Sequence, residues 1–173
     1  MKLNIGSSAP SKFHSKNEWI NIDVCKDFKG KNFAVADGCK LPFKDNSFDE
    51  IQAIHILEHI ERSKHKAFFN EIYRTLKLNG VIFIEVPDFI AICNYLSDIH
   101  NKKNHPNYQE QLRIWTLSVY GKGRYYGDTH RWGFYKELLQ LELEAVGFKV
   151  DFPDKMISNH YWAEPVILVR GVK

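Results

Sequence analysis

The sequence has few cysteines, and no two of them are close enough to form a C-x-x-C pair. Cys25, Cys39 and Cys93 lie far apart, and their number is odd. This pattern argues against a disulfide framework and against a cysteine-based structural zinc site. Reduced thiols are typical of the cytosol, so we expect a cytoplasmic protein.

The sequence also lacks long apolar runs and a strong excess of charge. No early segment resembles a signal peptide, and no stretch is long enough to span a membrane, so we expect no membrane partner. There are 24 basic and 21 acidic side chains, which gives a formal charge of +3. Lysines at 26, 29, 31 and 40 are interspersed with acids. Nucleic-acid binding needs clustered basic residues, so we expect no nucleic-acid partner.

What the chain does have is a regular succession of short strands, each followed by a polar residue. Its 173 residues, 44% of them hydrophobic, favour a single domain over 1–173. The β-rich segments are 2–6, 19–24 and 32–37. They end at Gly6, Asp23 and Asp37.

The segment "HILEH" at 55–59 has the H-x-x-E-H spelling of one class of zinc peptidases. That chemistry needs both histidines on one helix. A strong amphipathic pattern predicts a helix over 64–80, and "VIFIEVPD" at 81–88 reads as a buried parallel strand. The simplest layout makes 48–54 the strand that enters this crossover. His55 then ends the strand and His59 lies in the next turn, so we expect no metal site, and a zinc hydrolase is only a third hypothesis.

The segment 89–132 differs from the rest, because it is rich in Tyr, Trp, His, Asn and Gly. It is predicted to be an insertion with helices near 89–100 and 108–119. After it come a helix within 134–148 and two final strands that form a hairpin. The fold class is therefore α/β: a doubly wound, Rossmann-like, mostly parallel sheet with an antiparallel last strand.

Several segments together resemble the class I S-adenosylmethionine-dependent methyltransferases, in particular a small group related to type 11 methyltransferases. The matching stretches are "LNIGSS" at 3–8, "WINIDV" at 19–24, "ADGCKLPFKDNSFDEIQAIHILEHI" at 36–60 and "EIYRTLKLNGVIFIEVPD" at 71–88. The resemblance covers the first half closely, and "HRWGFYKELLQLELEAVGF" extends it more loosely.

The resemblance implies S-adenosylmethionine as the cofactor and assigns residues to its parts. A glycine after the first strand lets the backbone approach the methionine moiety, and a carboxylate at the end of the second can accept both ribose hydroxyls. The implied cofactor residues are Gly6, Ser7 and Ser8 at the first strand, Asp23 and Val24 at the second, Asp37, Gly38 and Cys39 at the adenine, and His55 near the methionine end. The family usually has another glycine where this chain has Ser8.

The expected reaction is methyl transfer to an unidentified small-molecule acceptor, with sugars among the candidates. The insertion at 89–132 is expected to form the acceptor site or a lid, with His130 as general base and Asp88 as an acceptor contact. Its aromatic residues fit either a substrate wall or a small second core. A homodimer is left open. The alternative function is a non-catalytic module that keeps the fold and binds the cofactor.

Overall fold

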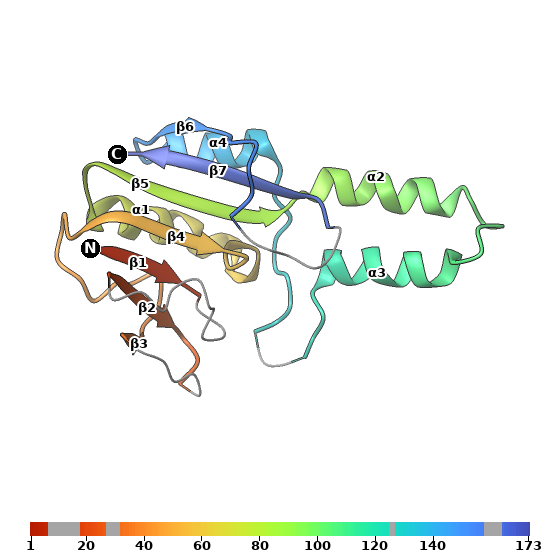
Figure 1. The fold of residues 1–173 in the computed structure, drawn as a ribbon, viewed down its shortest axis with the longest axis horizontal. Coiled ribbons are helices and arrows are strands. Elements are labelled where there is room, and N and C mark those ends of the chain that lie inside the picture. The colour runs from red at the N-terminus through yellow and green to blue at the C-terminus, as the bar shows by residue number, and fades with distance from the viewer. Residues whose placement is uncertain (7–17, 27–31, 125–126, 158–163) are drawn as a thin grey trace.

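In the computed structural model, residues 1–6, 18–26, 32–124, 127–157 and 164–173 are described, and they form one sheet with helices (Figure 1). The strands are β1 (Lys2–Ile5), β2 (Trp19–Asp23), β3 (Phe33–Val35), β4 (Phe48–Ile54), β5 (Leu76–Pro87), β6 (Lys149–Asp151) and β7 (Val166–Val172). The helices are α1 (His65–Thr75), α2 (Phe89–His100), α3 (Tyr108–Tyr120) and α4 (Lys136–Glu144), with short 3₁₀ turns η1 (Leu57–His59) and η2 (Arg62–Lys64).

The strand order is β3-β2-β1-β4-β5-β7-β6. The chain starts near the middle of the sheet, runs outward to β3, and returns to the other side of β1 with β4. Strands β1 to β5 pair in parallel, whereas β7 is antiparallel to both β5 and β6. This confirms the predicted fold class and the predicted final hairpin. It also brings the carboxyl ends of β1, β2 and β4 to one edge, where open α/β sheets bind ligands.

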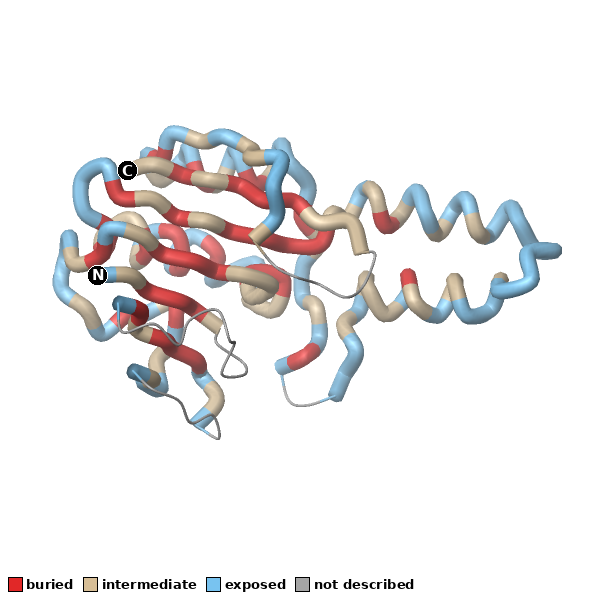
Figure 2. Tube along the Cα trace, viewed as in Figure 1, coloured by how far each residue is buried: buried red, intermediate tan, exposed pale blue. Residues whose placement is uncertain are grey.

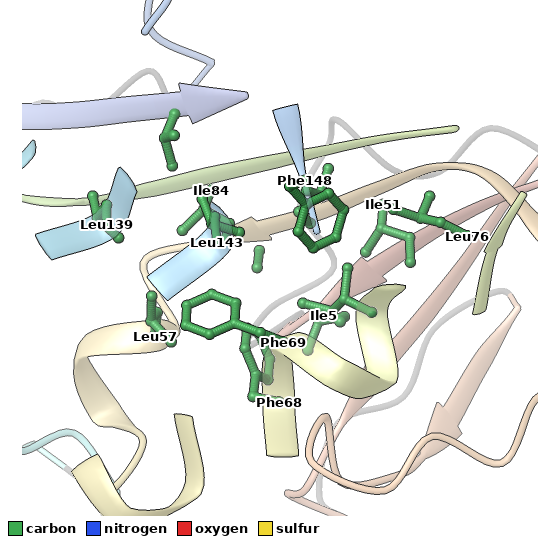
Figure 3. Packing of buried hydrophobic residues seen from close by; sticks show 14 of the residues in the cluster. Ile5, Ile51, Leu57, Phe68, Phe69, Leu76, Ile84, Leu139, Leu143 and Phe148 are labelled. Carbon is green, nitrogen blue, oxygen red and sulfur yellow. The ribbon is translucent and has the colours of Figure 1, made fainter. Parts of the chain in front are cut away.

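The core lies between the sheet and the helices α1 and α4. Figure 3 shows Phe68 and Phe69 of α1, with Leu139 and Leu143 of α4, packed toward strand side chains such as Ile84. All five are at most 1% exposed. Burying a side chain of this size contributes about 1.5–3 kcal/mol, so this layer holds the strand ends in place.

The predicted helix over 64–80 was too long. Helix α1 ends at Thr75, and β5 already begins at Leu76, which pairs with Phe48 of β4. The apolar residues that suggested a longer helix continue into the strand. Asn79 has a φ of 62° and donates its N–H to the carbonyl of Lys173. The Asn79-Gly80 pair is thus part of β5 and does not end the helix.

Helices α2 and α3 form an arm that extends away from the sheet (Figure 1) and is mostly exposed along its length (Figure 2). Its two helices match the predicted ones near 89–100 and 108–119. Trp115 stacks on Tyr95 with 4.7 Å between the ring centroids. The arm therefore has a small core of its own. Among the described residues, no helix combines the length and the apolar character needed to cross a membrane.

Candidate functional site

A cavity of about 320 Å³ lies at the carboxyl edge of the sheet, a volume typical of small-molecule sites. Strand ends, the connection before β4, the turns before α1 and the segment after α3 all contribute to it. Its lining residues are Ile5, Gly6, Asp23, Val24, Cys25, Ala36, Asp37, Gly38, Cys39, His55, Ile56, His59, Ile60, Glu61, Lys64, Phe68, Gly127 and Arg131.

Two glycines, Gly6 and Gly38, line the cavity at positions where the surrounding atoms leave no room for a side chain. Gly6 has a φ of +79°, and a Cβ there would lie 2.6 Å from the side chain of Ile56. Gly6 donates its N–H to the carbonyl of Ile22, which fixes the turn after β1. A Cβ on Gly38 would similarly lie 2.9 Å from the ring of Phe68. Both positions need glycine because the backbone passes so close to its neighbours.

Asp23 ends β2 with its carboxylate largely buried at the cavity wall. Its Oδ1 accepts the N–H of Cys25 at 2.9 Å. Burial raises the pKa of Asp23, and the N–H groups of Cys25 and Val24 partly offset this. A carboxylate has about four lone-pair sites, so acceptor capacity is left for a ligand.

The connection from β3 to β4 makes a tight turn at the cavity. Asp37 Oδ1 accepts the N–H of Cys39 at 2.8 Å, and the Asp37 carbonyl accepts the N–H of Lys40. Burial and the nearby Asp37 raise the pKa of the Cys39 thiol to about 11. The thiol therefore stays protonated and provides a small apolar contact, not a nucleophile.

His55 sits at the end of β4 in a left-handed backbone conformation, with a φ of 51°. Its Nδ1 lies 3.2 Å from Glu58 Oε1, and its Nε2 lies 3.3 Å from Glu85 Oε1. Burial alone would lower the pKa of His55, but the two carboxylates outweigh it and raise the pKa to about 9. The ring is therefore an imidazolium at neutral pH, held between two buried carboxylates.

This geometry argues against the zinc-peptidase hypothesis. His55 and His59 come from different elements, β4's end and η1, as the sequence predicts. Both nitrogens of His55 face carboxylates, so the ring is not placed to share an ion with His59.

The two predicted catalytic residues lie outside the cavity wall. Asp88 caps α2, where its Oδ1 accepts the N–H of Ala91. His130 reaches the cavity only through His59, whose ring centroid is 4.9 Å from its own. Burial lowers the pKa of His130, so its imidazole is neutral at neutral pH. Ser7 and Ser8, predicted at the cofactor, lie outside the described residues.

Among the described residues of the predicted insertion, Gly127 and Arg131 near its end are the ones that line the cavity. Trp115 belongs to the arm's own core, and Trp132 is 41% exposed. The residues after α3 are therefore the part of the predicted insertion that remains a candidate for the acceptor site or lid.

Sequence patterns did not single out His59, Glu61, Lys64 or Arg131 as cavity residues. Arg131 closes the wall: its backbone N–H donates to the Glu58 carbonyl at 2.7 Å, and its guanidinium lies 3.2 Å from Glu61 Oε1. For His59, Glu61 and Lys64 the local signal is the polar run at 61–66, which by itself also suits a helix start.

Part of the chain is similar in sequence to known proteins. Residues 16–84 match a family model described as a methyltransferase domain. An uncharacterized protein of Methanocaldococcus jannaschii is 40% identical over 68 residues, which is 39% of this chain but only 29% of that protein. The chain thus spans less than a third of the length of this curated relative.

Solved structures show the same fold over nearly the whole chain. A SAM-dependent methyltransferase of Thermotoga maritima matches with a TM-score of 0.63 and 18% identity, covering 99% of this chain and 81% of that one. One from Archaeoglobus fulgidus matches with a TM-score of 0.63 and 19% identity, covering 99% and 85%. The match over residues 16–84 and the shared fold together make the chain similar to S-adenosylmethionine-dependent methyltransferases.

Proposed function

We propose that this chain binds S-adenosylmethionine in the strand-edge cavity and transfers its methyl group to a small-molecule acceptor, with sugars among the candidates. The observation that carries the proposal is the convergence of Gly6, Asp23, Asp37 and His55 on one cavity. These residues come from four separate chain segments, and the family resemblance assigns a cofactor contact to each.

Asp23 suits the ribose, because its buried carboxylate keeps acceptor capacity beside the bond from Cys25. The turn of Asp37, Gly38 and Cys39 suits the adenine: Gly38 leaves space against Phe68, and the protonated thiol of Cys39 is a compact apolar contact. Gly6 brings the backbone to the methionine moiety. When bound, S-adenosylmethionine supplies a methyl group that its sulfonium already makes electrophilic.

The charges beside the cavity suit a cationic ligand. Glu58 and Glu85 are buried carboxylates, and the imidazolium of His55 between them balances only one of the two charges. A sulfonium at this end would find a net negative surrounding. The chain's main catalytic contribution is then to hold the acceptor in line with the methyl group, which is a proximity effect.

The acceptor is proposed to enter on the side formed by His59, Gly127 and Arg131. A hydroxyl or amine acceptor also needs a proton removed, and His130 remains the proposed base, because its imidazole is neutral and lies against His59. Asp88 is less suited to contact the acceptor, since its carboxylate caps α2. A homodimer stays a prediction.

Titration calorimetry with S-adenosylmethionine and its demethylated product tests the proposal. We expect one site per chain and a higher melting temperature, because a ligand that binds the folded state stabilises it. Absence of binding at millimolar cofactor would sink the proposal. Binding without transfer to any acceptor in a screen with labelled cofactor would support the non-catalytic alternative.

A further inference from the structure

Three side chains that can bind a metal ion meet at the edge of the cavity. Glu58 and His59 belong to η1, and His130 lies on the segment after α3. One ligand atom from each, a carboxylate oxygen or a ring nitrogen, lies within 4.8 Å of the other two. His59 is the member that also lines the cavity.

Both histidines turn a nitrogen lone pair toward this cluster. His59 Nδ1 lies 3.2 Å from the Thr129 carbonyl oxygen, and His130 Nδ1 lies 2.9 Å from the Ser118 carbonyl oxygen. A carbonyl only accepts, so each Nδ1 carries a proton, and Nε2 is the ring nitrogen that can bind a metal ion. Histidines that bind metals almost always donate their other N–H in this way.

Glu58 has a carboxylate oxygen for which the described residues supply no donor. Its side chain is 3% exposed, and Oε1 faces His55 at 3.2 Å. Oε2 is buried and has no hydrogen-bond partner among the described residues. The nearest ring nitrogen of His59, Nε2, lies 4.0 Å from Oε1, which is beyond hydrogen-bond distance. A buried acceptor left in this state is costly, and an ion is one of the few groups that can satisfy it.

Backbone hydrogen bonds hold the three residues together. The Glu58 carbonyl accepts the N–H of Arg131 at 2.7 Å, and His130 donates its own N–H to the Tyr120 carbonyl at 3.0 Å. The cluster is therefore fixed by main chain from both sides, which limits the ordering that an ion would have to impose.

We propose that Glu58, His59 and His130 form a site for a divalent transition-metal ion, for which zinc is the best fit. Two imidazole nitrogens and one carboxylate oxygen are a donor set that zinc accepts. Ligands about 2.0–2.2 Å from a shared ion lie at most about 4 Å apart, so small side-chain rotations complete the site. Three protein ligands leave a position open toward the cavity that His59 lines.

The proposed site departs from the sequence-based expectation of no metal. It is also not the site of the H-x-x-E-H spelling, because His55 is not a ligand and Glu58 binds the ion itself. Metal binding does not depend on the proposed methyl transfer. If both hold, His130 is a metal ligand and not the base, and an acceptor oxygen in the open position would be polarised by the ion and lose its proton to solvent more readily.

The test is zinc binding to the full chain after removal of metal with a chelator. Titration calorimetry with zinc chloride and elemental analysis after gel filtration should give about one zinc per chain. His59→Ala and His130→Ala should each weaken binding at least about 100-fold, since even indirect ligand partners are worth 10–100-fold. Glu58→Gln keeps the shape of the side chain and should also weaken binding.

His105→Ala is the matched control. His105 is an exposed histidine on the loop between α2 and α3, close to the exposed His100, and its loss should leave the stoichiometry unchanged. Circular dichroism shows which variants are folded, and Glu58→Gln decides the question if a histidine variant is not. A wild-type chain that binds no zinc at micromolar concentration overturns the proposal. Zinc that survives in both Glu58→Gln and His130→Ala also overturns the proposal, and its loss in His105→Ala would place the ion on the loop between α2 and α3.

Discussion

The hydrogen-bond acceptors on the two sides of the cavity differ in whether they already have a donor. The strand side carries Asp23 and Asp37, and the far side carries Glu58, His59 and His130. On the strand side, the carboxylates of Asp23 and Asp37 each already accept a backbone N–H, from Cys25 and Cys39. On the far side, Glu58 has a buried oxygen for which the described part of the chain supplies no donor, and His59 and His130, whose Nδ1 atoms face backbone carbonyls, lie beside it. The strand side is thus complete by itself and can accept further hydroxyl or amino groups. The far side needs a cation, as a proton or a metal ion, to be complete.

This difference suggests a division of labour. Acceptors that are partly satisfied hold a ligand without a large penalty when the ligand leaves, which suits an exchanged cofactor. Buried acceptors that lack donors either bind a cation strongly or stay unsatisfied at a cost in free energy. This suits a resident ion or a proton that takes part in chemistry.

The largest effect is expected from His130→Ala, which breaks the far side. Once an acceptor is found, turnover should fall by roughly 10²–10⁴, while the cofactor dissociation constant changes less than about twofold. The reason is that His130 contacts His59 and not the cofactor wall. Single-turnover assays and calorimetry measure the two quantities.

The same variant separates two roles for His130. If His130 is a base, His130→Ala leaves the zinc content of the purified protein unchanged. If His130 is a metal ligand, the same substitution lowers the zinc content. If turnover and cofactor affinity instead fall by the same factor, the strand side and the far side form one structural unit and do not have separate roles.

Asp23→Ala should have the next largest effect and break the strand side alone. Hydrogen bonds to a charged group are worth about 1.5–3 kcal/mol, so we expect S-adenosylmethionine to bind about 100-fold more weakly. Asp154→Ala, which removes an exposed carboxylate, is the control. Zinc binding should be unchanged in both. Wild-type cofactor affinity in Asp23→Ala would contradict its assigned place at the ribose.

A pH titration of stability probes His55, which lies between the two sides. Its pKa in the folded state is about 9, above the ordinary value of 6.5. The stabilisation is therefore fully present below about pH 6.5 and is lost as the pH rises through 9. Between pH 7 and 10 we expect a loss of about 2 kcal/mol in the free energy of unfolding that His55→Gln does not show. If the free energy of unfolding, measured by urea denaturation, changes equally with pH in the wild type and in His55→Gln, His55 is not an imidazolium in the folded state.

The strand side could be predicted from sequence because each of its parts is local. Gly6, Asp23 and Asp37 directly follow segments whose β-rich composition marks them as strands, and a parallel sheet brings such ends together. The fold class followed from the same pattern, whereas the strand order comes from the structure. The end of α1 was misplaced, because Leu76 continues the helical spacing of the apolar residues before it but already belongs to β5.

The far side could not be predicted in this way. The separation of His55 from His59 was correct, and it led to the expectation that no ion binds there. The partner that changes this picture, His130, lies 71 residues after His59 and returns only after the arm of α2 and α3. No local periodicity reports such a contact. The arm's aromatic residues were placed correctly on helices, yet the choice between a wall and a minor core depended on the Tyr95–Trp115 stack.

The smallest effect is expected from Arg131→Ala, which tests how the two sides are joined. The guanidinium pairs with Glu61, but the two side chains are 44% and 48% exposed, and such pairs contribute about 0–1 kcal/mol. The backbone N–H of residue 131 donates to the Glu58 carbonyl and is kept in the variant. Urea denaturation should therefore show a loss below about 1 kcal/mol, with cofactor and zinc affinities within about twofold of wild type. Loss of zinc in Arg131→Ala would mean that the side chain, and not the main chain, holds Glu58 against His130, and the far side would then depend on the exposed surface it shares with Glu61.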